Sequence, residues 1–104
     1  MIAYIKGRLA KVNPDGIILE NQGIGYRMMM PMRMEGFPKI GQEIQIYTHM
    51  HVREDDISLF GFRTQEELET FELLIGVNGI GPKVGLSVLA TLTVYELKMA
   101  IMTE

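Results

Sequence analysis

The feature that most constrains the fold is segment 74–85, which has the sequence LIGVNGIGPKVG. Apolar residues with helical spacing lie on both sides of a glycine turn, which predicts two helices joined by a hairpin. Gly79 and Gly81 permit backbone angles closed to other residues and leave peptide N–H groups uncovered. Ile80 is suited to fill the turn from inside, and Pro82 suits the first position of the second helix. The segment therefore predicts a helix-hairpin-helix.

The same turn has the chemistry of an anion site. The N-terminus of the second helix concentrates unpaired N–H groups and the positive end of the helix dipole, and Lys83 adds a full charge. A phosphate fits these groups. Gly85, one turn later, permits close approach of the preceding helix. A plain interhelical turn is the alternative, whereas a dinucleotide-binding fingerprint is disfavoured because it needs a third glycine within a βαβ unit.

Residues 1–62 have the alternation and turn residues of a β structure. We expect a bend or bulge at Gly7, a turn at 13–16, and strands at 2–12, 17–20, 25–30, 44–50 and 57–62. Five strands, one of them long and bent, suit a small closed barrel of the oligonucleotide-binding (OB) type. A generic five-stranded sheet fits the same pattern.

The remainder of the chain is predicted to be helical. Thr64 and Glu67 form a capping box that opens a first helix, whose apolar stripe is Leu68, Phe71, Leu74 and Ile75. A second helix is expected at 82–91, and a second capping box at 93–96 begins a third. We expect the face of that helix that carries Leu97 and Ile101 to be left uncovered. The predicted fold is all-β then all-α: an OB-fold barrel domain at 1–63 and an incomplete helix-hairpin-helix domain, with the first hairpin only, at 64–104.

Composition narrows the possible functions. Because the 104 residues include no cysteine, disulfides and thiolate metal sites are excluded, and we expect a cytoplasmic protein without a membrane-spanning run. The net charge is −3, and residues 64–104 carry two basic against six acidic side chains. A nucleic-acid binder ordinarily has a basic excess. DNA binding by this chain must therefore depend on directed amides and on a few cations present in several copies.

Methionines cluster in segment 28–34, at Met28, Met29, Met30, Met32 and Met34. Methionine fills irregular cores and also forms adaptable protein-binding surfaces. Both interpretations stay open.

A second constellation lies in segment 48–56, THMHVREDD. His49 and His51 followed by three carboxylates have metal-ligand residue types, which would suit a hydrolase, but the chain has no further histidine to complete a site. We therefore predict no metal, cofactor or catalytic residue. Three consecutive carboxylates beside Arg53 form instead a negative tip that repels phosphates. A solvated loop tip without a function is the alternative.

The chain as a whole resembles the bacterial RuvA family of Holliday-junction-binding proteins. The resemblance is carried by segments 1–7 (MIAYIKG), 23–26 (GIGY), 48–62 with VRED and LFGF, and 78–83 (NGIGPK). It implies an OB barrel followed by a domain with two helix-hairpin-helix motifs. Glu54 and Asp55 match the family's acidic pin, and Gly79, Gly81 and Lys83 match its first DNA-binding hairpin. We add Asn78 and Arg53 as DNA-binding candidates.

The resemblance further implies a non-enzymatic homotetramer that holds a four-way DNA junction open and loads a RuvB-type motor ATPase for branch migration, in recombination and repair. A RuvC-type resolvase is a possible further partner. Members of the family continue through a second hairpin and a third domain that contacts the motor, and we expect both to lie outside this sequence. A protein-assembly module that does not bind DNA is the alternative function.

Overall fold

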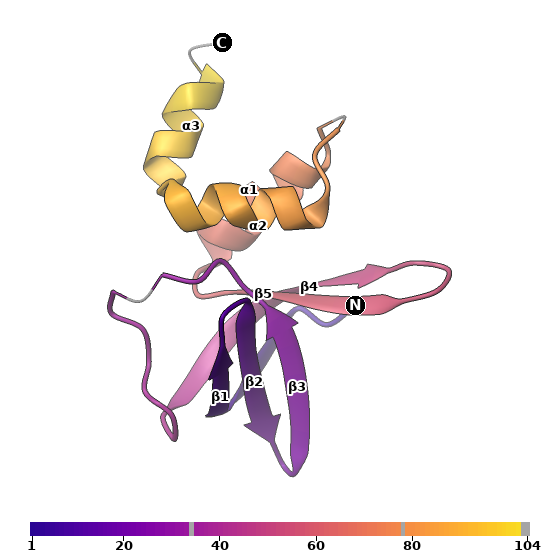
Figure 1. Ribbon diagram of the computed structural model, residues 1–104, viewed down its shortest axis with the longest axis vertical. Coiled ribbons are helices and arrows are strands. Elements are labelled where there is room, and N and C mark those ends of the chain that lie inside the picture. The colour runs from indigo at the N-terminus through magenta and orange to yellow at the C-terminus, as the bar shows by residue number, and fades with distance from the viewer. Residues whose placement is uncertain (34, 78, 103–104) are drawn as a thin grey trace.

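The computed structural model describes residues 1–33, 35–77 and 79–102, the side chains of residues 98 and 100–102 excepted. Five strands come first: β1 Tyr4–Asn13, β2 Gly16–Asn21, β3 Ile24–Met29, β4 Glu43–Val52 and β5 Ile57–Phe62. Three helices follow: α1 Gln65–Ile75, α2 Pro82–Thr91 and α3 Val94–Met102. The predicted order, all-β then all-α, is confirmed. Figure 1 shows the strands in the lower half and the helices stacked above them.

The strands close into a barrel in the order β1-β2-β3-β5-β4. All neighbours are antiparallel except β3 and β5, which pair in parallel at Met29 and Phe60. The register of β1 shifts between Leu9 and Lys11, so the prediction of a bulge at Gly7 was wrong, while that of a bend stays a prediction. A Cβ at Gly7 would lie 2.4 Å from the carbonyl oxygen of Glu20, so this glycine permits close approach of β2. The closed barrel confirms the OB-type prediction over a generic sheet.

One hairpin extends from the barrel. Strands β4 and β5 pair from Tyr47–Phe62 out to Val52–Ile57, and the N–H of Arg53 donates to the carbonyl of Asp56 across the turn, at 2.7 Å. In Figure 1 this hairpin projects to the right, beyond the body of the barrel, on the side where the turn between α1 and α2 also lies.

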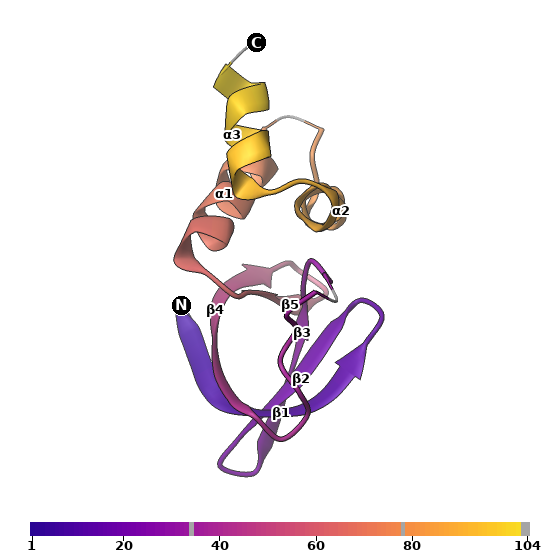
Figure 2. The same ribbon diagram turned by 90° about the vertical axis from the view of Figure 1, so that its left-hand side faces the viewer.

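Two hydrophobic cores hold the structure together. The first fills the barrel and consists of Ile5, Leu9, Ile17, Leu19, Met28, Met30 and Ile46. The second joins β5 to the helices and consists of Phe60, Phe62, Leu68, Phe71, Leu74, Leu89 and Leu97. The rings of Phe62 and Phe71 lie 4.8 Å apart at its centre. The helices are therefore seated on the barrel, as Figure 2 shows from the side.

The second core corrects one expectation about α3. Leu97 is only 5% exposed and packs in this core, so the prediction that its face is left uncovered was wrong for Leu97. The side chain of Ile101 is outside the described residues.

The methionine cluster contributes mainly to packing. Met28 and Met30 are buried in the barrel core, Met32 packs against that core and Met29 against the second core. Met34 is outside the described residues. The core-filling interpretation accounts for the methionines that the structure describes.

In the described part of the chain, no helix has both the length and the apolar character needed to cross a membrane.

Candidate nucleic-acid interface

The turn between α1 and α2 has the geometry of a tight glycine hairpin. Gly79 has φ +87°, in the left-handed region where glycine is favoured. Gly81 has φ −88° and ψ 172°, an extended conformation that any residue adopts, so the prediction of a special backbone angle is wrong for Gly81. A Cβ at Gly81 would meet nothing within 4 Å. The space around this position is therefore open. Asn78 lies outside the described residues.

Apolar contacts hold the turn and the start of α2 against α1. Ile80 packs against the second core, as expected for the apolar residue of the turn. A Cβ at Gly85 would lie 3.2 Å from Cε1 of Phe71 and 3.5 Å from Cγ2 of Ile75. Gly85 therefore allows α2 to lie close against α1, which confirms the prediction for this glycine.

The N-terminus of α2 is uncapped. Pro82 occupies the start of the helix and Gly81 is its N-cap residue, without a side chain to accept from the first turn. Gly85 N–H donates to Gly81 O at 3.0 Å, whereas the amides of Lys83 and Val84 have no backbone acceptor among the described residues. The side chain of Lys83 is exposed. Unpaired amides and a cation at a helix N-terminus can bind an anion.

The acidic loop at the tip of the β4–β5 hairpin is fully in solvent. Arg53, Glu54, Asp55 and Asp56 are all exposed. The carboxylate of Asp56 accepts a hydrogen bond from Ser58 Oγ at 2.8 Å. Glu54 and Asp55 have no hydrogen bond or ion pair with any described residue. Their charges are therefore neutralised by no neighbour in that part of the chain.

A cleft of about 530 Å³ lies between this hairpin and the start of α2. Arg53 lines it from the barrel, and Gly81 and Lys83 line it from the helices. The structure thus brings together three of the predicted site residues that are up to thirty positions apart in sequence. Glu54 and Asp55 do not line this cleft.

Comparison with known proteins identifies the family of the chain. The family model described as the RuvA N terminal domain matches residues 1–61. The chain belongs to the RuvA family.

Relatives agree with this assignment. Three of them carry the name Holliday junction branch migration complex subunit RuvA. The one from Lachnospira eligens is 48% identical over 100% of this chain, that from Acetivibrio thermocellus 49% over 100%, and that from Geobacter sulfurreducens 47% over 97%. These alignments cover 51%, 52% and 51% of the respective relatives, so the chain spans about half of their length.

Two residues that line the cleft of this RuvA-family chain were missed as DNA-binding candidates. His51 and Ser58 face it from β4 and β5. From the sequence, His51 was considered as a metal ligand and not as a DNA contact. The sequence could have indicated this for His51, because residues i and i+2 of a strand lie on the same face and His51 is two positions before Arg53.

The histidine pair does not form a metal centre with other described residues. No group of three His, Cys, Asp or Glu side chains in that part of the chain could hold a metal ion. His49 Nδ1 lies 2.9 Å from Glu72 Oε2, and its ring packs edge-on against Phe71 at 5.6 Å. His49 thus connects β4 to α1.

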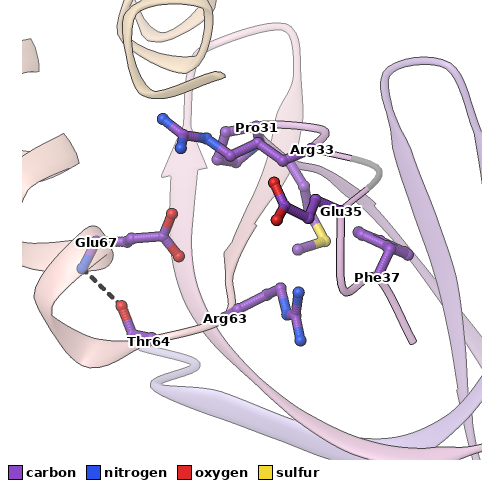
Figure 3. A pocket seen from close by; sticks show the side chains of 8 residues that line it. Pro31, Arg33, Glu35, Phe37, Arg63, Thr64 and Glu67 are labelled. Carbon is purple, nitrogen blue, oxygen red and sulfur yellow. Dashed lines mark hydrogen bonds between the residues drawn. The ribbon is translucent and has the colours of Figure 1, made fainter. Parts of the chain in front are cut away.

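A loop residue of the barrel, Arg33, holds the far end of α2. Its Nε and Nη2 donate to Leu89 O at 3.1 and 2.8 Å, and Nη2 also donates to Leu92 O. These carbonyls lie at the C-terminal end of α2, where the last carbonyl groups of a helix have no N–H partner within the helix. Figure 3 shows Arg33 beside a cleft of about 270 Å³ at the junction of barrel and helices. Sequence analysis missed this contact.

Of the two predicted capping boxes, the one at Thr93 forms completely, whereas the one at Thr64 shows only the hydrogen bond to the threonine side chain. Thr64 Oγ1 accepts from Glu67 N at 3.1 Å, the dashed line in Figure 3. At the start of α3, Glu96 N donates to Thr93 Oγ1 and Thr93 N donates to Glu96 Oε1, both at 3.0 Å. The hydrogen bond from the Thr93 backbone, with that from its side chain, holds the pKa of Glu96 below its usual range.

Proposed function

We propose that this chain is a non-catalytic, structure-selective DNA-binding subunit that binds four-way (Holliday) junctions in a branch-migration complex, acting in recombination and repair in the cytoplasm. Membership of the RuvA family and the names of its relatives support the proposal. The single observation that carries it is the cleft in which Arg53 meets Gly81 and Lys83.

The hairpin would contact the phosphate backbone. The uncapped start of α2 presents amides, and Lys83 supplies a positive charge at the same place. Contacts of this kind fix the position of a protein on DNA and carry no sequence information. Gly79 shapes the turn, Gly81 leaves its amides accessible, and Asn78 is retained as a candidate from the sequence alone. We propose that these residues bind whichever duplex arm they meet.

The acidic loop would supply selectivity. Glu54 and Asp55 are exposed at the end of a hairpin that projects from the barrel. A negative tip is repelled by phosphates, and it is tolerated best where strands separate around it, as at the centre of a junction. We propose that the two carboxylates act as a pin there and oppose binding elsewhere.

Assembly would compensate for the acidic composition. With a net charge of −3, one chain offers few cations, whereas a homotetramer presents four copies of each cleft to four DNA arms. We propose such a tetramer, with a RuvB-type motor ATPase and a RuvC-type resolvase as partners. We also propose that residues 1–63 and 64–104 act as barrel and hairpin units of each subunit.

A competition titration tests the proposal. A labelled four-way junction is bound to the chain at fixed salt, and unlabelled junction or linear duplex of the same length is added. We expect the junction to compete at much lower concentration. Equal competition would refute structure selectivity, and a stable oligomer that shifts neither DNA would support the assembly-module alternative.

A further inference from the structure

The cleft between the β4–β5 hairpin and α2 has basic side chains that form no ion pair with a described carboxylate. Elsewhere in the described chain, Lys6 lies 3.7 Å from Glu43 and Arg8 is paired with Glu20. Arg53 and Lys83, which line the cleft, form no ion pair with a described residue. Two permanent positive charges therefore face the same space.

The acidic residue that lines this cleft, Asp56, forms hydrogen bonds within its own loop. Asp56 accepts a hydrogen bond from Ser58 Oγ at 2.8 Å, and its carbonyl accepts from Arg53 N at 2.7 Å. These contacts turn the loop back on itself without forming an ion pair to Arg53. The inner surface is apolar, with Met29 from β3 and Phe60 from β5. Cations beside an apolar surface suit a sugar-phosphate strand.

His51 is the third group in the cleft that can carry positive charge. Its ring packs edge-on against Phe60 at 6.2 Å, which sets its orientation. It forms no hydrogen bond with a described residue, in contrast to His49, which is 2.9 Å from Glu72. Histidine is the side chain whose charge ordinarily changes between pH 5 and 8.

The charges around His51 come from three elements. Arg53 and Asp56 lie in the loop after β4, and Lys83 lies on α2. His49 is on the same strand, with its ring 6.2 Å away, and Glu72 of α1 lies beyond it. A phosphate placed among these groups would favour the protonated ring strongly.

We propose that His51 contacts a DNA phosphodiester in this cleft together with Arg53 and Lys83, and that binding is coupled to protonation of its ring. The proposal rests on the proposed function, and it adds a pH-dependent contact to the same site. Affinity for DNA then rises as the pH falls from 7.5 to 5.5. Because a phosphate contact is blind to strand geometry, junction and duplex gain alike.

The test is a set of anisotropy titrations of labelled junction at pH 5.5 and 7.5, each over a range of salt, with the parent and three variants. One charge-assisted contact is worth roughly tenfold in Kd, so the parent is expected to tighten at pH 5.5 by about that factor relative to His51→Gln. At pH 5.5 only, the slope of log K against log salt should be shallower in His51→Gln by about 0.9 per contact. His51→Lys should bind tightly at both pH values.

His49→Gln is the matched control, because this histidine faces Glu72 and does not line the cleft. It should keep the pH dependence of the parent. Thermal melts of every variant at both pH values establish that each is folded. If parent and His51→Gln respond identically to pH and salt, His51 is not a contact, while junction selectivity stands. If the parent binds no DNA at either pH, both proposals fail.

Discussion

Replacing Arg33 with methionine should loosen the attachment of α2 to the barrel. The change keeps an apolar stem of similar length and removes the donors to Leu89 O and Leu92 O. Hydrogen bonds from a charged donor contribute about 1.5–3 kcal/mol each when well buried. Because Arg33 is only partly buried, we take about 2 kcal/mol for the two carbonyls together.

That loss is large for a chain of this size. In a domain of about 100 residues, each 1 kcal/mol lowers the melting temperature by roughly 4–8 °C, so Arg33→Met should melt roughly 8–16 °C below the parent. Arg33→Lys keeps the charge but not the planar fork, and should fall about midway. The assay is thermal unfolding followed by circular dichroism at pH 7, with hydrogen exchange of the amides at the α2–α3 corner.

Arg27→Met is the matched control for this series. Arg27 is exposed on β3 and forms no ion pair with a described residue, so its loss should leave the melting temperature within about 2 °C of the parent. If Arg33→Met and Arg27→Met have the same melting temperature, Arg33 does not stabilise the attachment of α2, and our explanation of how the helix-hairpin-helix is positioned on the barrel is wrong.

Three further predictions concern the helices. Gly79→Ala should lower the melting temperature by roughly 4–8 °C, because a backbone angle φ of +87° costs a residue with a side chain about 1 kcal/mol. Gly81→Ala should melt at the same temperature as the parent but bind DNA more weakly, because the added methyl group would cover the neighbouring amides. Hydrogen bonds from Thr93 lower the pKa of Glu96, so the ionised carboxylate stabilises the folded chain above about pH 4.3, and this stabilisation is lost as the pH falls further. The difference in melting temperature between the parent and Glu96→Gln should therefore disappear as the pH falls below that value. Lys83→Ala should weaken binding to junction and duplex alike, with a salt slope shallower by about 0.9 per site, and an unchanged slope would remove Lys83 from the interface.

Local signals in the sequence were enough to locate the elements. Proline at position 82 and the threonine caps at 64 and 93 act within a few residues, and the helices begin where these signals predict. The bulge predicted at Gly7 and the backbone angle predicted for Gly81 were wrong because the sequence shows that a Cβ is absent but not which contact or angle requires its absence. Gly7 permits close approach of β2, and Gly81 has an extended backbone with open space where a Cβ would lie.

Contacts between distant segments could not be predicted in the same way. Arg33 reaches a carbonyl 56 positions away, and no local pattern pairs a loop arginine with the end of a helix. Leu97 belongs to a core that also contains residues of β5, α1 and α2, and these come together only because the helices pack on the barrel. The cleft of His51, Arg53 and Lys83 likewise exists because β4 and α2 meet there.

The central claim is that the acidic loop makes binding selective for junctions. The variant Glu54→Gln/Asp55→Asn keeps the size of the loop and removes two negative charges per chain, both of them exposed. The most direct measurement is the ratio of junction affinity to duplex affinity, taken by competition at fixed salt for parent and variant side by side. We expect the variant to bind junctions at least as tightly and its ratio to fall, because duplex binding gains more. A ratio that rises or stays the same would contradict the account.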